Sequence, residues 1–269
     1  MEEPAGGDLS AERIVAALGS DRTFGHPVQY FGVGVSAESL ALGWARKQDA
    51  PEGALVVMDV ELSARGRRGV TWVSVAGRSL AFALVLRPAL PPAGEGLLWL
   101  LASLAAAEGV EAATGMDVAL KWPNDLLVGG RGVGGVRVDA QLGPGMIDTA
   151  VLTVRLNVGL EPDDFPDGLR PQVTSLAMEM QGAAPPRLAV LEAILGRLDE
   201  WYEAGVPALL EGYKARCGTL GTRVRALLMP AGDAVGTAAD IDDQGGLVIK
   251  TPSGHGSIGV DRLKRLEAD

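Results

Sequence analysis

The sequence predicts an α/β protein of the α+β type, with a mixed β-sheet domain covered by helices and a small C-terminal β domain. Strand-length apolar runs and helical segments are mixed without the strict β–α alternation of a doubly wound parallel sheet. After Gly218, short β-like runs separated by glycine-rich and aspartate-rich turns replace the helices. A chain of 269 residues is long enough for one large and one small domain. We predict that these domains comprise residues 1–217 and 218–269.

The helices are predicted from their caps and from their apolar patterns. Ser10 can cap a first helix that ends at Gly19, and Ser36 opens a second helix. The apolar run 97–107 predicts a helix buried in the core, because the run is too short to span a bilayer. Two further helices are predicted over residues 187–203 and 207–217.

The strands are predicted from short runs rich in Val, Leu and Ile. The run 54–60 has few polar breaks, which is typical of a central strand buried on both faces. The other strands predicted for the larger domain comprise residues 28–31, 80–86, 116–120, 126–128, 133–139 and 149–158. Those predicted for the C-terminal domain comprise residues 222–228, 236–240, 247–250 and 258–260.

The composition argues against several classes of function. The formal net charge of −10 argues against a general nucleic-acid binder, which needs a basic face. Cys217 is the single cysteine, and His26 and His255 are the only histidines, so we expect neither a disulfide framework nor a zinc site. We assign no metal ligands. The acidic N-terminus lacks a signal-peptide pattern, and we expect a soluble, cytoplasmic protein without a membrane segment.

The stretch Lys-Trp-Pro-Asn-Asp at residues 121–125 is the most unusual in the chain. Proline fixes its own φ at about −65° and keeps the preceding Trp122 out of the helical region. The motif therefore holds a large aromatic side chain in an extended backbone, beside one cation and one carboxylate. Two interpretations of these five residues stay open. They form part of a site, or they form a corner between two strands in which Asn124 and Asp125 bond their own backbone.

A second motif, Arg-Gly-Arg-Arg-Gly at residues 65–69, closely follows the strand predicted at 54–60 and precedes Trp72. We name residues 65–69 the arginine loop. Three guanidiniums on a loop with two glycines suit the recognition of phosphate and carboxylate groups, and the tryptophan offers a flat face for a base. The GxxxxGK[ST] pattern of a Walker loop is absent here, and a surface loop that binds nothing stays an alternative.

Together, the two motifs resemble those of the biotin protein ligases, and the match at residues 121–125 is specific. The resemblance covers roughly residues 9 to 265. Further matching segments are Tyr30-Phe31, Leu86-Arg87-Pro88, Gly134-Gly135, Leu156-Asn157-Val158, Thr174-Ser175-Leu176 and Thr219-Leu220-Gly221. The fold implied by the resemblance is a catalytic domain related to class II tRNA synthetases, followed by a small SH3-like β-barrel.

The resemblance also implies a reaction in two steps. Biotin and ATP with Mg²⁺ give an enzyme-bound biotinyl-adenylate and pyrophosphate, and the biotinyl group then passes to a lysine of a biotin carboxyl carrier protein. Only about 30 residues precede the first matched strand, too few for a winged-helix DNA-binding domain, so we do not expect a repressor. The implied protein is a monofunctional ligase that acts as a monomer or a homodimer.

The residue roles are implied by the same resemblance. Arg65 and Arg67 would hold the biotin carboxylate and the α-phosphate and stabilise the charge that develops there, and Lys121 joins them as a catalytic residue. The implied substrate-binding residues are Ser36, Arg65, Gly66 and Arg67. The implied nucleotide-binding residues are Arg68, Gly69, Trp72, Asn124, Asp125 and Asn157.

The sequence departs from the family pattern, and these departures keep other functions open. Gly132 replaces the lysine expected nearest the reacting groups, and losing one such donor commonly costs about 10²–10³ in turnover. In the biotin pocket the replacements are Ala37, Glu38, Glu61, Thr153 and Arg155. The sequence leaves open whether Arg155 points into that pocket. Three functions remain: a biotin ligase, a ligase that adenylates a different carboxylic acid, and a catalytically impaired nucleotide- or biotin-binding homologue.

Overall fold

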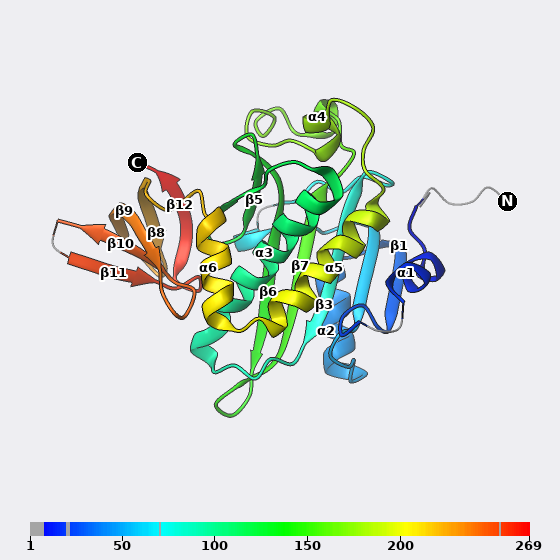
Figure 1. Cartoon of the computed structure of the whole chain (residues 1–269), viewed down its shortest axis with the longest axis horizontal. Coiled ribbons are helices and arrows are strands. Elements are labelled where there is room, and N and C mark those ends of the chain that lie inside the picture. Colours follow the sequence, from blue (N-terminus) through cyan, green and yellow to red (C-terminus); the bar gives the residue numbers. More distant parts are fainter. Residues whose placement is uncertain (1–7, 20–21, 70, 253) are drawn as a thin grey trace.

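The computed structural model describes residues 8–19, 22–69, 71–252 and 254–269. A seven-stranded mixed sheet forms the larger part of the molecule, and a five-stranded antiparallel sheet forms the C-terminal part (Figure 1). The predicted fold class is confirmed by this arrangement. The position of the domain boundary, between residues 217 and 218, stays a prediction.

The larger sheet has the strand order β1-β2-β3-β7-β6-β5-β4. Its strands are β1 (Val28–Gly34), β2 (Leu55–Glu61), β3 (Ser79–Leu86), β4 (Ala119–Lys121), β5 (Asp125–Val128), β6 (Arg131–Leu142) and β7 (Ile147–Asn157). The helices are α1 (Ala11–Leu18), α2 (Ala37–Lys47), α3 (Glu95–Thr114), α4 (Leu176–Met180), α5 (Arg187–Glu203) and α6 (Val206–Arg216). Short 3₁₀ turns are η1 (Arg67–Gly69), η2 (Pro92–Gly94) and η3 (Pro162–Asp164). β1 pairs with β2 in parallel, and the other pairs in this sheet are antiparallel, as a mixed sheet requires.

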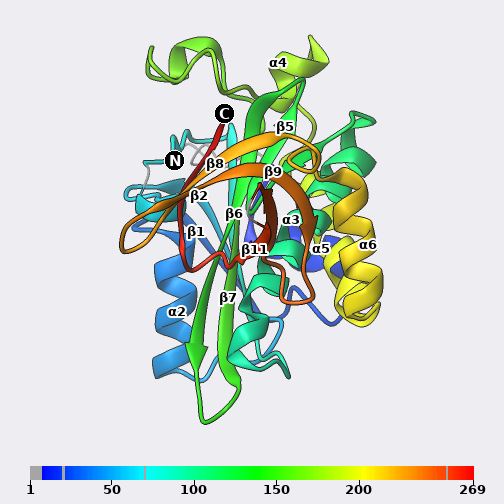
Figure 2. The same cartoon turned by 90° about the vertical axis from the view of Figure 1, so that its left-hand side faces the viewer.

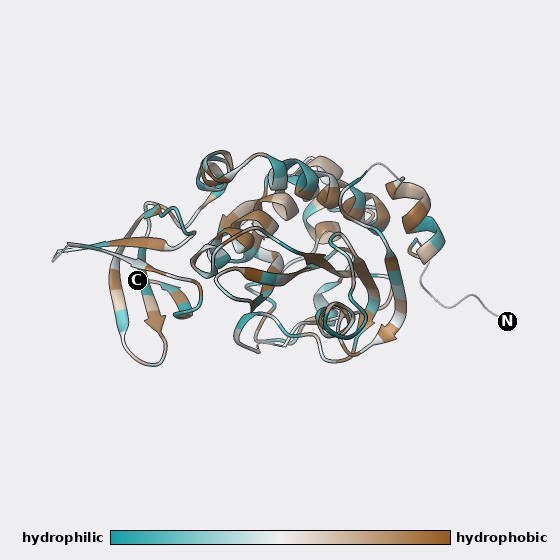
Figure 3. Cartoon of the chain, turned by 90° about the horizontal axis from the view of Figure 1, so that it is seen from below, coloured by the Kyte–Doolittle hydropathy of each residue, from teal (hydrophilic) through white to brown (hydrophobic). Residues whose placement is uncertain are grey.

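Helices cover both faces of the larger sheet (Figure 2). α2 packs on one face, against β2, β3 and β7, while α3 packs on the other and carries α5 and α6 on its outer side. β3 is buried along its whole length, because it has a strand on each side and helices on both faces. Figure 3 shows the apolar residues concentrated in the strands and on the inward sides of the helices. The core therefore fills both layers between sheet and helices.

The C-terminal sheet has the strand order β11-β10-β9-β8-β12. Its strands are β8 (Arg223–Leu228), β9 (Asp233–Ile241), β10 (Leu247–Thr251), β11 (Gly254–Ile258) and β12 (Leu263–Ala268). The strand predicted over 258–260 was therefore wrong, and β12 was not predicted. β12 consists largely of good helix formers and β11 contains two glycines, so local propensity opposes both strands. Pairing of β12 with β8 and of β11 with β10 overrides that propensity.

α3 is longer than the predicted buried helix 97–107 and spans 20 residues. It ends at Gly115, whose φ of 73° is the left-handed conformation that favours glycine after a helix. By length and composition, the segment Pro92–Thr114 could cross a membrane, but 72% of its apolar 18-residue stretch is buried inside the protein. This burial is typical of the core helix of a folded domain.

The two sheets are joined by contacts of the motif at residues 121–125. Trp122 is 1% exposed, and its indole N–H donates a hydrogen bond to the carbonyl of Gly245 at 3.0 Å. Its backbone N–H donates to Thr219 Oγ1, also at 3.0 Å. A Cβ built on Gly96 of α3 would overlap the carbonyl oxygen of Gln244, so the two backbones meet there without room for a side chain. The motif therefore seats the C-terminal sheet against the larger domain.

This close approach predicts an unusual response to a helix-favouring substitution. Alanine normally stabilises a helix interior relative to glycine by about 1 kcal/mol. We expect Gly96→Ala instead to lower Tm by about 2–10 °C, because the added methyl group meets the backbone of the C-terminal domain. Gly94→Ala is the matched control, since the atoms nearest its Cβ would be Leu90 carbons at 3.5 Å or more. A Gly96→Ala protein as stable as the Gly94→Ala protein would contradict the predicted seating.

Candidate active site

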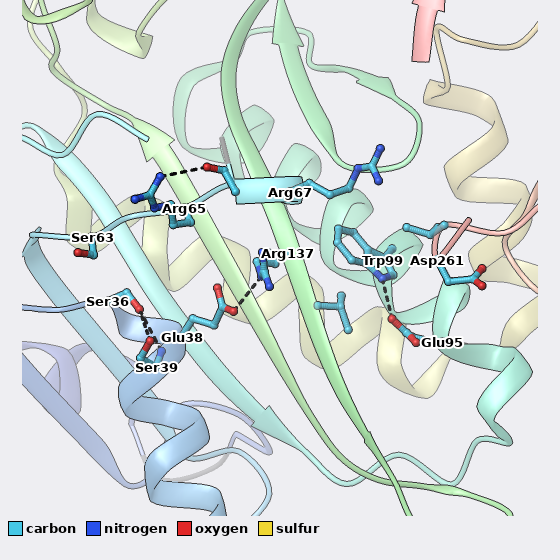
Figure 4. Close-up of a pocket in the computed structure, with 13 residues that line it drawn as sticks. Ser36, Glu38, Ser39, Ser63, Arg65, Arg67, Glu95, Trp99, Arg137 and Asp261 are labelled. Atoms are coloured by element: carbon cyan, nitrogen blue, oxygen red, sulfur yellow. Dashed lines mark hydrogen bonds and ion pairs between the residues drawn. The ribbon is translucent and has the colours of Figure 1, made fainter. Parts of the chain in front are cut away.

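A cavity of about 600 Å³ lies between the arginine loop, the start of α2, β6 and the C-terminal domain (Figure 4). Its walls carry both acidic and basic side chains. The lining residues are Ser36, Glu38, Ser39, Ser63, Arg65, Arg67, Gly69, Glu95, Trp99, Arg137, Val138, Val260 and Asp261. This volume is typical of a site that holds a small molecule.

The start of α2 forms one wall of the cavity. Ser36 is the N-cap of the helix, with an extended backbone, and its hydroxyl accepts a hydrogen bond from the Ser39 N–H at 3.1 Å. Glu38 faces Arg137 of β6, and its carboxylate pairs with Arg137 Nε at 2.8 Å (Figure 4). Burial raises the pKa of Glu38, while the charges of Arg137 and Arg155 oppose the shift. This wall is therefore polar and charged.

The arginine loop forms the second wall, and its first and third residues leave the loop in opposite directions (Figure 4). Arg65 is exposed, and its guanidinium donates to the carbonyl of Gly69 at 3.2 Å and to Thr71 Oγ1 at 3.3 Å. Arg67 donates to the carbonyls of Leu263 at 2.6 Å and Lys264 at 3.2 Å. Arg65 thus presents a cation to the cavity, while Arg67 also ties the loop to β12.

None of residues 121–125 lines the cavity. Trp72 and Asn124 flank Gly135 of β6, where a Cβ would lie 3.9 Å from Trp72 Cζ3 and 3.7 Å from Asn124 Nδ2. Lys121 and Asp125 are cross-strand partners at the β4–β5 turn. Burial raises the pKa of Asp125, and the charges of Lys121 and Arg67 oppose this shift. The structure therefore brings Trp72 and Asn124 together around Gly135, with Asp125 within the electrostatic reach of Arg67.

The remaining predicted site residues have different positions. Gly66 accepts a hydrogen bond from Arg137 Nη1 at 3.3 Å, which ties the loop to β6. Gly69 has a φ of 76° and lines the cavity. The side chain of Arg68 lies outside the described part of the structure. Asn157 is buried away from the cavity lining, and its side-chain amide donates to the carbonyl of Thr174 at 2.9 Å.

The structure settles the direction of Arg155, which the sequence left open. Arg155 is 3% exposed and turns toward Glu61 at the end of β2. Its Nε lies 2.6 Å from Glu61 Oε2, and its Nη2 lies 2.9 Å from Glu61 Oε1. Its Nη1 donates to the carbonyl of Arg65 at 3.0 Å. A bidentate ion pair therefore lies directly under the arginine loop.

The cavity residues that were not assigned from the sequence include Glu95, Trp99, Arg137 and Asp261. Arg137 could have been found, because it lies two residues after Gly135 and so faces the same side of β6. Trp99 and Glu95 belong to the apolar helix, and Asp261 comes from the C-terminal domain, so no local signal marks them. Among the described residues, no group of three or more His, Cys, Asp or Glu side chains is placed to hold a metal ion.

Comparisons with known proteins agree with the fold and the motifs. The chain matches the family described as "Biotin/lipoate A/B protein ligase family" over residues 36–157. It also matches the "Biotin protein ligase C terminal domain" over residues 219–260.

Two curated relatives are ligases by name. The bifunctional ligase/repressor BirA of Bacillus spizizenii is 34% identical over 213 residues, covering 77% of this chain. The match covers 64% of that relative, so this chain spans just under two thirds of the length of that relative. The biotin–[acetyl-CoA-carboxylase] ligase of Mycobacterium tuberculosis is 32% identical over 206 residues, covering 74% of this chain and 73% of the relative.

A solved structure with the same fold is the biotin protein ligase from Aquifex aeolicus in complex with biotin and ATP. It is similar with a TM-score of 0.76 at 23% identity, covering 91% of this chain and 100% of that chain. The sequence relatives are named as ligases, so the predicted enzyme class is confirmed at the level of the family. By its motifs, its sequence matches and its fold, the chain belongs to the biotin/lipoate A/B protein ligase family.

Proposed function

We propose that this protein is an ATP-dependent biotin–protein ligase, which forms biotinyl-AMP and transfers the biotinyl group to a lysine of a biotin carboxyl carrier protein. The observation that carries the proposal is the cavity with the exposed Arg65 guanidinium on one wall and Ser36 on another. Names of relatives support the substrates, because they include biotin, ATP and acetyl-CoA carboxylase.

In the proposed reaction the biotin carboxylate attacks the α-phosphorus of ATP, and pyrophosphate leaves. Arg65 would hold the carboxylate and stabilise the charge that develops on the phosphate oxygens. The positive charge of Arg67 acts on the pKa of Asp125, against the effect of burial. The Arg67 guanidinium also holds the loop against β12. The adenine would lie beside Trp72 and Asn124, which stand together around Gly135. Mg²⁺ enters as part of the ATP substrate, bound mainly by phosphate oxygens and water.

The partner, the location and the assembly belong to the same proposal. We propose a biotin carboxyl carrier protein or domain as the acceptor and the cytoplasm as the location. We propose a ligase without a repressor function, because the formal net charge of −10 disfavours nucleic acid. A monomer or a homodimer fits the proposed activity.

A second candidate is a ligase that activates a different carboxylic acid. The Glu61–Arg155 ion pair favours this candidate, because it places two charged side chains where the resemblance implies a glutamine and a glycine. A third candidate is a catalytically impaired homologue that binds the nucleotide or biotin, and Gly132 favours it. Acid-dependent exchange of pyrophosphate into ATP separates the three.

Exchange of pyrophosphate into ATP tests the leading candidate directly. With saturating biotin and Mg-ATP, the native protein should exchange labelled pyrophosphate into ATP, because adenylate formation is reversible on the enzyme. Biotin amide, which lacks the carboxylate, is the matched control and should support no exchange. Absence of exchange at any attainable biotin concentration would rule out the leading candidate. Exchange with another acid would favour the second.

The two arginines should respond differently to substitution by methionine, which keeps much of the side-chain stem. Arg65→Met should lower the exchange rate by about 10²–10³ because it removes the cation facing the cavity. Its Tm should stay within about 2 °C, since the side chain is exposed. Arg67→Met should lower both the exchange rate and Tm, because it also removes the hydrogen bonds to β12. Equal losses of Tm in the two variants would contradict these assignments.

Restoring the lysine expected at position 132 should raise activity. A Cβ on Gly132 would meet only the carbonyl oxygen of Gln172, at 3.5 Å, so the backbone accepts a side chain there. Gly132→Lys should raise the exchange rate by at least about tenfold, because it adds a cation near the reacting phosphate. Gly132→Met has a similar length without the charge and should bring no gain. A methionine variant as fast as the lysine variant would refute the electrostatic explanation.

A further inference from the structure

The Glu61–Arg155 ion pair joins β2 and β7 to two of the elements that frame the cavity, the start of α2 and the arginine loop. Glu61 ends β2, and its Oε1 accepts a hydrogen bond from the Ala37 N–H at 2.8 Å, at the first turn of α2. Arg155 comes from β7 and donates to the carbonyl of Arg65 in the arginine loop. The side chains of Glu61 and Arg155 are 0% and 4% exposed. The pair is therefore buried next to the cavity, and neither side chain lines it.

The hydrogen-bonding capacity of the Glu61 carboxylate is largely used. One oxygen accepts bonds from the Ala37 N–H and from Arg155 Nη2, and the other accepts a bond from Arg155 Nε. An ionised carboxylate has no proton to donate. A ligand that needed Glu61 as a partner would have to displace Arg155. That displacement would leave a buried charge unpaired, which is strongly unfavourable.

Arg155 also fills a trough between small residues. Across the sheet it is level with Gly135 of β6 on one side and with Ala81 of β3 on the other. Cross-strand partners face the same side, so Arg155 stands between an alanine and a glycine, with Met58 of β2 beyond Ala81 and Asp125 of β5 beyond Gly135. Thr153 lies next along the same face, fully buried. Without the guanidinium, this part of the row would leave a space over Ala81 and Gly135.

We infer that the Glu61–Arg155 pair is a specificity-determining element that closes this trough and confines the acid to the cavity in front of it. The inference rests on the proposed function only in that the cavity binds a carboxylic acid. The carboxylate end would lie at Arg65. The far end of the acid then lies among Ser36, Ser39 and the Glu38–Arg137 pair. An apolar ring at this end adds little to the affinity of the acid. The pair therefore limits the affinity for biotin and reduces discrimination in favour of its ring.

Two charge-neutral double variants separate the space that the pair fills from the charge that it carries. Glu61→Gln with Arg155→Gly opens the trough, whereas Glu61→Gln with Arg155→Met removes the charges but keeps the trough filled. Biotin affinity is measured by titration calorimetry without ATP. We expect the glycine variant to bind biotin at least about tenfold more tightly than both the methionine variant and the native protein, because burying only a few ring atoms contributes this much.

Equal biotin affinity of the glycine and methionine variants would overturn the inference. Failure of the inference also differs from failure of the proposed function. If the native protein exchanges pyrophosphate but opening the trough does not raise the biotin affinity, the proposed function stands and the inference fails. If opening the trough raises the biotin affinity but neither the native protein nor any variant exchanges pyrophosphate, the inference stands and the proposed function fails.

A measurement on the native protein covers the case in which the glycine variant does not fold. Pentanoic acid has the carboxylate and chain of biotin without its rings. If the rings cannot enter the trough, biotin should bind the native protein no more than about tenfold more tightly than pentanoic acid, by competition calorimetry. A preference of 100-fold or more for biotin would contradict the inference.

Discussion

A buried bidentate ion pair between Glu61 and Arg155 is the constraint that shapes this site. Taking both charges out of water is expensive, and the pair persists because each partner is matched and further hydrogen-bonded to Ala37 and to the carbonyl of Arg65. Removing one partner alone would cost about 3–5 kcal/mol. The pair consequently fixes the positions of β2, β7, α2 and the arginine loop relative to one another, and two of these, α2 and the arginine loop, form walls of the cavity.

The second constraint is the seating of the C-terminal sheet. Trp122 donates to Gly245, Arg67 reaches β12, and α3 meets the C-terminal domain where Gly96 leaves no room for a side chain. Asp261 thereby becomes part of the cavity wall. The unusual motif at residues 121–125 thus has a structural role in addition to its place behind the site. The C-terminal domain completes the cavity, and its position bears directly on substrate binding.

Much of the fold could be predicted from the sequence because its signals are local. The caps Ser10 and Ser36 and the apolar runs of β2 and β3 indicate their elements without reference to distant residues. β12 could not be predicted, because pairing with β8 imposes the strand on helix-forming residues. The arginine loop and Ser36, both singled out from the sequence, meet at the cavity, and their roles stay predictions. The direction of Arg155 and the contribution of Asp261 depend on tertiary contacts, which no local pattern encodes.

The most direct test is a crystal structure of the native protein with a non-hydrolysable biotinyl-adenylate analogue. We expect the acyl-phosphate linkage within hydrogen-bond distance of Arg65, the adenine beside Trp72 and Asn124, and an intact Glu61–Arg155 pair in front of which the rings lie. An analogue whose rings displace Arg155 and lie over Ala81 and Gly135 would contradict this expectation. An adenylate bound away from the cavity would contradict it as well.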